Sequence, residues 1–266
     1  MSEQATQQRY AAAAQQKEDA LCCPVDYDPR FLTAIPQEVI EKDYGCGDPS
    51  RYLKTGETVL DLGSGAGKIC FIAAQIVGPE GRVIGVDMTD EMLEVARRNA
   101  PVVAKAIGFA NVEFRKGKIQ DLQTAPERPG EVLVESGSVD VVVSNCVLNL
   151  VESAQKEQLF AEIYRVLKPG GRAVISDIVS NVPVPAELKA DPELWSGCIS
   201  GALTRKAFLG AFVEAGFESM QTLKFDSQPW RTVAGIQFHA MTIEARKEEL
   251  ADNDADSECC CGPGCC

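Results

Sequence analysis

The sequence lacks the two features that would direct a protein into or across a membrane. No uninterrupted apolar run approaches the roughly 20 residues of a spanning helix. The N-terminus, MSEQATQQRY, has no basic stretch followed by an apolar one, so it does not resemble a secretory signal. We therefore expect a cytoplasmic protein in a reducing compartment, with no membrane partner.

Positive charge and histidine are also scarce. The 26 Lys and Arg residues are outnumbered by 39 Asp and Glu residues, which gives a net charge of −13. Because so acidic a surface repels phosphate backbones, we expect no nucleic-acid partner. The single histidine, His239, falls on a late strand-like segment, where we interpret it as structural.

The chain does contain a regular alternation of strand-like and helix-like segments. Strands are expected at 58–63, 82–88, 111–115, 138–146, 172–178, 219–225 and 236–246, and helices at 36–43, 68–77, from 91 onward, at 154–168 and at 204–215. We expect Pro36 at the first position of its helix, and Asp90 to cap the helix that follows it. The alternation predicts an α/β fold with a mostly parallel seven-stranded sheet, helices on both faces and a mixed edge.

The composition also suggests how the chain is divided. We expect an N-terminal segment and cap at 1–55, whose first 20 residues form a loose helix or stay mobile, and a nucleotide-binding α/β domain at 56–179. Residues 180–248 would hold a functional, irregular, Pro-rich segment at 180–202 and complete the sheet. We expect residues 249–266 to form an acidic, Cys-rich, flexible tail.

The strongest local motif is a glycine-rich loop, Gly63-Ser64-Gly65-Ala66-Gly67-Lys68, between a strand and a helix. A dinucleotide loop needs G-x-G-x-x-G, but position 68 is a lysine. A phosphate-binding P-loop also fails, because Leu62 and Ile69 stand where a glycine and a hydroxyl residue are required. The loop therefore suits a nucleoside ligand that has no pyrophosphate.

Two carboxylates flank this loop in a way that suggests the ligand. Asp61 precedes the first glycine and can hold an ammonium group, while Asp87 ends the next strand and can bind a ribose diol. S-adenosylmethionine is a ligand of this kind. Its predicted contacts are Asp61, Gly63, Ser64, Gly65, Asp87 and Met88, together with Lys118 and Ile119 after the third strand, where an ordinary turn explains the sequence nearly as well.

Cysteine is abundant: there are 11, of which five lie in the last eight residues. The six others are Cys22, Cys23, Cys46, Cys70, Cys146 and Cys198, and none of these forms a C-x-x-C pair of the kind found in zinc knuckles. Each could be a small buried core side chain, which is the interpretation we favour for Cys70.

Three of the cysteines fall where a ligand crevice is expected. Cys146 ends the fourth strand, Cys198 lies in the irregular segment, and Cys46 lies between Gly45 and Gly47, which we expect to expose it. Three thiols beside a methyl donor suggest a thiophilic substrate. Trivalent arsenic binds three thiolates and keeps a lone pair, whereas zinc prefers four ligands.

The motifs together resemble those of a known family. The segments VLDLGSGAGKICFIAAQIVG, GVDMTDEMLEVAR, VVSNCVLNLV, RVLKPGG and LWSGCISGAL occur in the order found in the arsenite S-adenosylmethionine methyltransferases, over about residues 40–245. The resemblance implies a Rossmann-like class I methyltransferase fold that methylates arsenite for detoxification. The motifs around Cys46, Cys146 and Cys198 are its most specific part.

The resemblance also implies roles for individual residues. Cys146 and Cys198 would be the main arsenic ligands, and Cys46 would be the third ligand and a redox thiol. Cys22 or Cys23 would be the redox partner of Cys46, and Tyr44 would lie beside the cofactor. Asn145, which precedes Cys146 at the end of the fourth strand, is a further expected cofactor contact. Arsenite or its glutathione conjugate would be the substrate, glutathione or thioredoxin would be the reductant, and we expect a monomer.

Two alternatives remain open at this point. The chain could methylate an ordinary small organic acceptor, with its cysteines serving only as core side chains. It could also be a non-enzymatic, thiol-rich metalloid-binding protein that relies on its tail.

Overall fold

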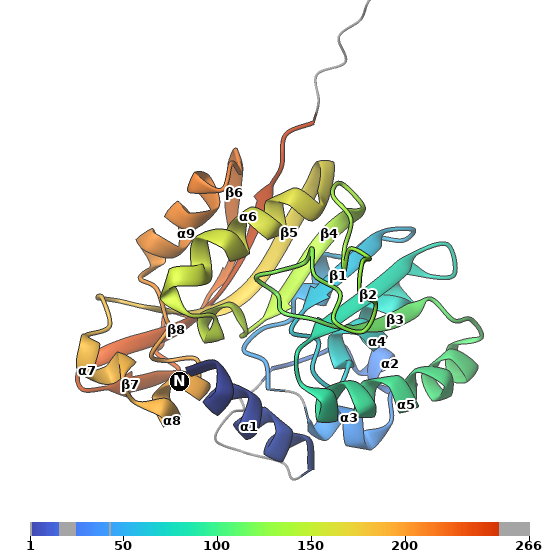
Figure 1. Cartoon of the computed structure of the whole chain (residues 1–266), viewed down its shortest axis with the longest axis horizontal. Coiled ribbons are helices and arrows are strands. Elements are labelled where there is room, and N and C mark those ends of the chain that lie inside the picture. The colour runs from blue at the N-terminus through green and yellow to red at the C-terminus, as the bar shows by residue number, and fades with distance from the viewer. Residues whose placement is uncertain (1, 16–24, 43, 250–266) are drawn as a thin grey trace, which may run out of the picture.

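A single mixed sheet organises the molecule, with helices against both of its faces (Figure 1). The computed structural model describes residues 2–15, 25–42 and 44–249. The strands are β1 (Thr58–Leu62), β2 (Arg82–Asp87), β3 (Val112–Lys116), β4 (Val139–Asn145), β5 (Leu167–Ser180), β6 (Ser219–Phe225), β7 (Arg231–Val233) and β8 (Ile236–Arg246). The helices are α1 (Ser2–Gln15), α2 (Pro29–Leu32), α3 (Gln37–Glu41), α4 (Lys68–Val77), α5 (Asp90–Ile107), α6 (Lys156–Val166), α7 (Ala186–Lys189), α8 (Pro192–Ser196) and α9 (Arg205–Glu214), with 3₁₀ turns η2 (Pro49–Tyr52), η3 (Leu148–Leu150) and η4 (Ser153–Gln155).

The strand order is β3-β2-β1-β4-β5-β8-β6, and β7 pairs with β8. The strands from β3 to β5 are parallel, and β8 runs antiparallel to both β5 and β6. The predicted α/β fold, with seven mostly parallel strands and a mixed edge, is therefore confirmed, and the short β7 adds an eighth strand beside β8. The order reverses between β1 and β4, which is where open α/β sheets form a ligand crevice.

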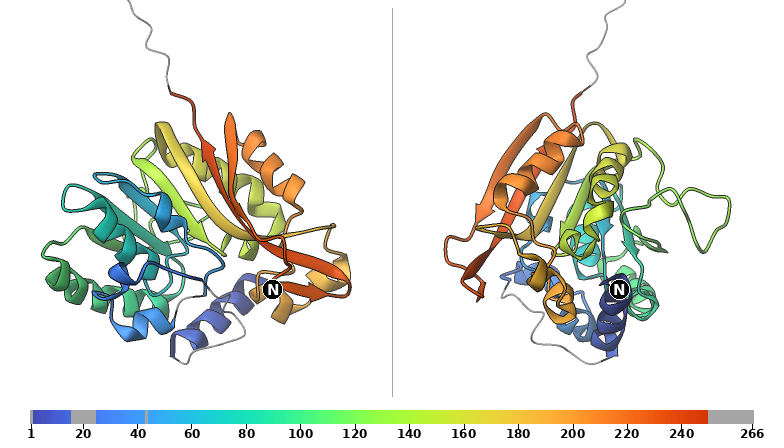
Figure 2. Two further views of the ribbon diagram at one scale, coloured as in Figure 1. Left: turned by 180° about the vertical axis from the view of Figure 1, so that it is seen from behind. Right: turned by 60° about the vertical axis from the view of Figure 1, so that its left-hand side comes forward.

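The core is divided between the two faces of the sheet by the alternation of strand side chains. On β4, Val141 and Val143 pack into the cluster formed with α4 and α5, whereas Val142 packs into the cluster formed with α6 and α9. All three are fully buried, and each contributes about 1.5–3 kcal/mol to stability. Helices therefore pack against both faces of the sheet (Figure 2).

The predicted end of the helix at 154–168 was wrong, as was the start of the strand after it. Helix α6 stops at Val166, and β5 begins at Leu167. Leu167 pairs with Val139, but the next pair along β4 joins Val141 to Arg172, so residues 168–171 form a bulge within β5. Gly170 supplies the positive φ that the bulge requires, which is why the Pro-Gly-Gly sequence does not interrupt the strand.

Smaller predictions also need correction. Thr89, rather than Asp90, occupies the N-cap position of α5, and Pro36 occupies the N-cap position of α3 rather than its first turn. The irregular segment 180–202 contains the short helices α7 and α8. Within the described ranges, no helix combines the length and apolarity needed to cross a bilayer.

Candidate active site

The glycine-rich loop between β1 and α4 forms one wall of a pocket at the carboxyl ends of β1, β2 and β4. Gly63, Gly65 and Gly67 all have positive φ values, of 71°, 52° and 91°. A Cβ atom on Gly63 would also come within 2.5 Å of the Val147 side chain, so only glycine fits there. The loop can therefore turn sharply and present its backbone to a ligand.

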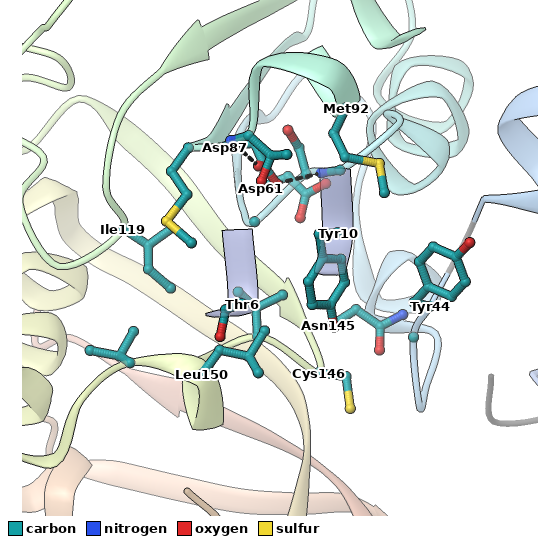
Figure 3. Close-up of a pocket in the computed structure, with 18 of the residues that line it drawn as sticks. Thr6, Tyr10, Tyr44, Asp61, Asp87, Met92, Ile119, Asn145, Cys146 and Leu150 are labelled. Carbon is teal, nitrogen blue, oxygen red and sulfur yellow. Dashed lines mark hydrogen bonds between the residues drawn. The ribbon is translucent and has the colours of Figure 1, made fainter. Parts of the chain in front are cut away.

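Two carboxylates face this pocket, the buried Asp61 and the half-buried Asp87 (Figure 3). The Asp87 carboxylate accepts hydrogen bonds from the backbone N–H groups of Gly65 at 2.9 Å and Thr89 at 2.8 Å. Burial raises the pKa of Asp87, although these hydrogen bonds oppose the shift. The Asp61 carboxylate accepts a hydrogen bond from the Cys70 thiol at 3.2 Å, so the buried Cys70 also supports the pocket wall.

The polar groups of the pocket fit S-adenosylmethionine. Ser64 Oγ is buried in the wall and has no hydrogen-bond partner within the described part of the chain. An unsatisfied buried hydroxyl costs about 1–3 kcal/mol, a cost that a polar ligand group would remove. Asp61 and Asp87 offer acceptors for an ammonium group and a diol, and Ile119 offers an apolar surface for a base.

Most of the predicted cofactor contacts line this pocket. They are Tyr44, Asp61, Gly63, Ser64, Gly65, Asp87, Met88, Ile119 and Asn145. Lys118 is exposed and lies outside the pocket wall, where its backbone pairs with Asp121.

Helix α1 contributes two wall residues that the sequence did not predict. Thr6 and Tyr10 line the pocket, and the Tyr10 and Tyr44 rings meet edge to face, 6.1 Å apart. The Tyr44 hydroxyl donates a hydrogen bond to the Ala13 carbonyl at 3.0 Å. An Ala/Gln-rich helix with few large side chains carries no sequence signal for such a position.

Cys46, Cys146 and Cys198 lie in one buried cluster beside the pocket. They come from the loop before η2, the end of β4 and the segment after α8, and they pack with Ile178 and Phe238. They are only 5%, 5% and 2% exposed. Cys146 also lines the pocket, whereas Cys46 and Cys198, which share its cluster, are not among the lining residues.

The expectation that the glycines around Cys46 would expose it was wrong. A Cβ atom on Gly45 would lie 2.0 Å from Asn145 Nδ2, and one on Gly47 would lie 2.6 Å from Ser176 Oγ. The glycines instead allow this loop to press against the ends of β4 and β5, which buries the thiol.

Two of the clustered cysteines have an unusual backbone. Cys146 has a φ of 63° and Cys198 a φ of 62°, in the left-handed region that non-glycine residues rarely adopt. Such a conformation costs on the order of 1–3 kcal/mol and persists only where the surroundings enforce it. Strain of this kind gathers at functional sites, and here it occurs at two chain-distant thiols in one cluster.

The thiols influence one another. The Cys198 thiol donates a hydrogen bond to the Cys146 carbonyl at 2.9 Å, and the Cys146 side chain interacts with those of Cys198 and Cys46. The contact with Cys198 lowers the pKa of Cys146. The contact with Cys46 and burial together raise this pKa by more, so it lies well above the ordinary value of a thiol. The interaction with the Cys146 side chain and burial likewise raise the pKa of Cys198.

The three sulfurs are not yet arranged as a ligand set. Across residues 2–15, 25–42 and 44–249, no group of three or more His, Cys, Asp or Glu side chains has the geometry to hold a metal ion. Instead, the Cys198 thiol points to the Cys146 carbonyl.

Asn145 holds the Cys46 loop in place. Its Oδ1 accepts hydrogen bonds from the backbone N–H groups of Cys46 at 2.9 Å and Gly47 at 3.1 Å. Its Nδ2 donates to the Gly47 carbonyl at 2.7 Å and contacts the Tyr27 hydroxyl at 3.1 Å. Although Asn145 lines the pocket, protein groups therefore use both ends of its amide.

A second asparagine, which the sequence did not single out, anchors the Cys198 segment. Asn149 Nδ2 donates to Asp177 Oδ1 at 2.8 Å, to the Ile178 carbonyl at 2.7 Å and, more weakly, to the Cys198 carbonyl at 3.4 Å. Burial raises the pKa of Asp177 to about 6. Burial also lowers the pKa of the neighbouring Lys156 to about 8, although the charge of Asp177 opposes this shift.

The remaining predicted residues do not contribute to this geometry. Cys22, Cys23 and the cysteines of the tail lie outside the described residues. The His239 ring stacks on Phe225, and its Nδ1 lies 3.0 Å from the Asp226 carbonyl, in keeping with a structural role.

Comparison with known proteins agrees with the pocket. A family model described as a methyltransferase domain matches residues 53–216. The arsenite methyltransferase of Halobacterium salinarum is 46% identical over 217 residues, which are 78% of this chain and 51% of that protein. The human arsenite methyltransferase is 38% identical over 188 residues, which are 70% of this chain and 48% of that protein.

A solved structure is similar along more of its length. It is that of an arsenic(III) S-adenosylmethionine methyltransferase from Chlamydomonas reinhardtii, with a TM-score of 0.74 and 34% identity, and the match covers 85% of this chain and 75% of that one. The chain spans about half the length of the two curated relatives named above. On these similarities, the chain belongs to the arsenite methyltransferase family and has its class I methyltransferase domain.

Proposed function

We propose that this protein methylates trivalent arsenic, using S-adenosylmethionine as the methyl donor and Cys46, Cys146 and Cys198 as the arsenic ligands. The observation that carries the proposal is the gathering of these three thiols in one buried cluster next to the nucleoside pocket. The two left-handed cysteines add support, because an ordinary core position does not need such strain.

The pocket residues would hold the donor. Asp87 would bind the ribose diol, Asp61 and the 63–65 loop the amino-acid end, and Ile119 the base. S-adenosylmethionine supplies an electrophilic methyl group when it is bound, and trivalent arsenic held by three thiolates keeps a lone pair that can accept it. The main task of the chain is to position the two substrates, and such positioning can lower the activation free energy by several kcal/mol.

Arsenic binding requires a small rearrangement of the cluster. The Cys198 side chain has to leave the Cys146 carbonyl and turn its sulfur towards those of Cys46 and Cys146. Each thiol also has to lose its proton, which burial disfavours. We therefore expect arsenite affinity to rise with pH.

The reductant belongs to the same proposal. Donation of the lone pair to a methyl group oxidises arsenic by two electrons. Two thiols, Cys46 with Cys22 or Cys23, would return them by forming a disulfide, and glutathione or thioredoxin would reduce this disulfide.

The direct test is methylation of arsenite by the purified chain with labelled S-adenosylmethionine and a thiol, followed by speciation of the arsenic products. Replacing Cys146 or Cys198 by serine should reduce methylation at least a hundredfold, because serine is a poor arsenic ligand. Cys265→Ser, in the tail, is the matched control and should retain wild-type activity. Wild-type rates in Cys146→Ser would refute the thiolate site.

The same assay separates the alternatives. An organic-acceptor enzyme would give no methylated arsenic and would tolerate Cys198→Ser. A sequestering protein would lose metalloid binding when residues 251–266 are deleted, whereas an arsenite methyltransferase of the kind proposed would still methylate.

A further inference from the structure

Tyr27 lies between the nucleoside pocket and the loop before η2. It is buried in the segment that leads into α2. Its hydroxyl donates a hydrogen bond to the Gly47 carbonyl at 3.3 Å and accepts one from Asn145 Nδ2 at 3.1 Å. The neighbouring Asp26 carbonyl accepts a hydrogen bond from the Arg51 guanidinium of η2. The segment before α2 is therefore tied to the rest of the site at two consecutive residues.

The Tyr27 hydroxyl completes a set of hydrogen bonds around Cys46. Asn145 Nδ2 also donates to the Gly47 carbonyl at 2.7 Å, so the hydroxyl, the amide and the carbonyl all contact one another. The Oδ1 end of the same amide accepts from the N–H groups of Cys46 at 2.9 Å and Gly47 at 3.1 Å. Asn145 precedes Cys146, and both line the pocket (Figure 3). The hydroxyl therefore helps to hold the amide that fixes the backbone at Cys46.

The ring of Tyr27 contacts the nucleoside side of the site. The Lys68 ammonium lies over this ring, 3.9 Å from its centroid. Lys68 is buried and lines the pocket directly after the glycine-rich loop. Because a cation–π contact is stronger where water is excluded, the ring helps to hold the ammonium at the pocket wall. The hydroxyl and the ring of Tyr27 thus act on different halves of the site.

We propose that Tyr27 is a positioning residue of the methyl-acceptor site: its hydroxyl holds Cys46 in the thiol cluster by fixing the Asn145 amide. The last torsion of an asparagine side chain is broad and roughly two-fold, so the amide needs partners at both ends to keep one orientation. The hydroxyl supplies such a partner at the Nδ2 end, opposite the Cys46 backbone. The inference rests on the proposed function, which makes Cys46 an arsenic ligand.

Alkylation of the ligand-free protein tests this contact without arsenic. A buried thiol reacts with iodoacetamide only when its surroundings open, so the rate reports how often they do. We expect Tyr27→Phe, which keeps the ring, to speed alkylation of Cys46 about fivefold, because one hydrogen bond that closes the loop is lost. Tryptic peptides separate the thiols: residues 43–51 contain only Cys46, and residues 69–82 contain only Cys70. Cys70 is the internal control and should react at its wild-type rate.

The chain also contains a convenient probe of arsenite binding. It has only two tryptophans. Trp195 lies in α8, where its carbonyl accepts a hydrogen bond from the Cys198 N–H at 3.0 Å, and Trp230 packs against the thiol cluster. Quenching of tryptophan fluorescence therefore measures arsenite binding without requiring turnover.

The affinities for the two ligands should separate in Tyr27→Phe. We expect the Kd for arsenite to rise about fivefold, because one of its three thiols is held less firmly. The Kd for S-adenosylhomocysteine should stay within about twofold, because the ring beneath Lys68 remains. In turnover, KM for arsenite should rise while KM for S-adenosylmethionine holds, a division that a general loss of structure would not give.

Two further variants separate the hydroxyl from the ring. Tyr27→Leu removes both, so it should also weaken S-adenosylhomocysteine, about threefold, because Lys68 loses its aromatic contact. Tyr164→Phe is the matched control. The Tyr164 ring also lies under an ammonium, that of Lys247 at 4.4 Å, but neither residue lines the pocket or belongs to the thiol cluster. This control should change neither Kd nor the alkylation of Cys46.

A double variant tests whether Tyr27 acts through Asn145. Asn145→Ala alone should speed alkylation of Cys46, and adding Tyr27→Phe to it should cause no further increase, because both changes act on one amide. Effects that simply multiply would overturn this route.

The alkylation and binding readouts distinguish failure of this inference from failure of the proposed function. If wild type binds no arsenite but Tyr27→Phe speeds alkylation of Cys46, the proposed function fails and the hold of Tyr27 on the loop stands. Wild-type alkylation of Cys46 in Tyr27→Phe overturns the role of Tyr27, whatever the arsenite result. An unchanged arsenite Kd, or an equal loss of affinity for both ligands, also overturns it.

Discussion

Cys146 and Cys198 each occupy a backbone conformation that L-residues avoid, and this lowers the stability of the fold. Left-handed φ brings Cβ too close to the following carbonyl oxygen, at about 1–2 kcal/mol per residue. Hydrogen bonds from the Cys146 N–H to the Ser176 carbonyl and from the Cys198 N–H to the Trp195 carbonyl hold the two backbones in place. The strained backbone directs the side chains of Cys146 and Cys198 into one cluster, although the two residues are far apart in the sequence.

A pair of substitutions at position 198 measures this strain. We expect Cys198→Gly to be more stable than Cys198→Ala by about 1 kcal/mol, because glycine adopts positive φ freely. At Gly210 in α9, where φ is not positive, the preference should reverse, and Gly210→Ala should stabilise by a similar amount. Denaturant unfolding of the four proteins gives these free energies. An alanine at 198 that matches or exceeds glycine in stability would contradict the strain.

Asp177 gives a second prediction from a single residue. Its pKa of about 6 in the folded state exceeds the unfolded value of about 3.9, so the folded protein binds more protons between these values. Stability from this group is therefore present below about pH 4 and lost as pH rises through about 6, by roughly 3 kcal/mol. Asp177→Asn cannot titrate, so wild type should lose this much stability relative to the variant between pH 4 and 7. A difference that does not change with pH would show that Asp177 is not a desolvated acid.

Among the helices and strands, the sequence predicts those whose boundaries are marked by strong local signals. The predicted ranges for α4, β6 and β8 match the structure, because glycines or clear changes in hydrophobic period border each one. The junction of α6 and β5 was wrong because a Pro-Gly-Gly sequence forms either a turn or a bulge, and only pairing with β4 selects the bulge. Cys146 could be placed near the pocket because it ends a parallel strand. Tyr10 and Asn149 could not be assigned, because packing between distant segments defines their roles.

In the loop after Cys198, Gly201 lies very close to the backbone of Asn149 in η3. A Cβ atom on Gly201 would lie 1.8 Å from the Asn149 carbonyl oxygen, a backbone atom that cannot turn aside. Gly201→Ala should therefore push the Cys198 segment away from η3 and lower arsenite methylation at least tenfold, while the Kd for S-adenosylhomocysteine changes little. Gly210→Ala is the matched control, since nothing lies within 4 Å of its added Cβ. Wild-type methylation by Gly201→Ala would show that the close approach does not position the thiol.

In the molecule as a whole, the nucleoside pocket and the thiol cluster are neighbours built from different parts of the chain. The pocket belongs mainly to β1, β2 and their loops, and the cluster belongs to the ends of β4 and β5 and to segments that precede and follow the α/β core. Helix α1 packs on both sides and has a small buried face, with Thr6, Ala13 and Ala14 buried. An isolated helix of 14 residues is only marginally stable, so its order depends on these contacts.

This arrangement predicts that the two ligands bind cooperatively. A ligand on either side of α1 orders the helix, and the second ligand then meets a lower ordering cost. We expect saturating S-adenosylhomocysteine to lower the Kd for arsenite at least fivefold, and arsenite to tighten S-adenosylhomocysteine by the same factor, as linkage requires. Calorimetric titration of each ligand with and without the other measures both factors. In Tyr10→Ala the factor should approach one, because the α1 side chain that lines the pocket together with Cys146 is gone, whereas Gln8→Ala, on the exposed face of α1, should keep it. If the two ligands bind independently to the wild-type protein, α1 covers both sites without coupling their affinities.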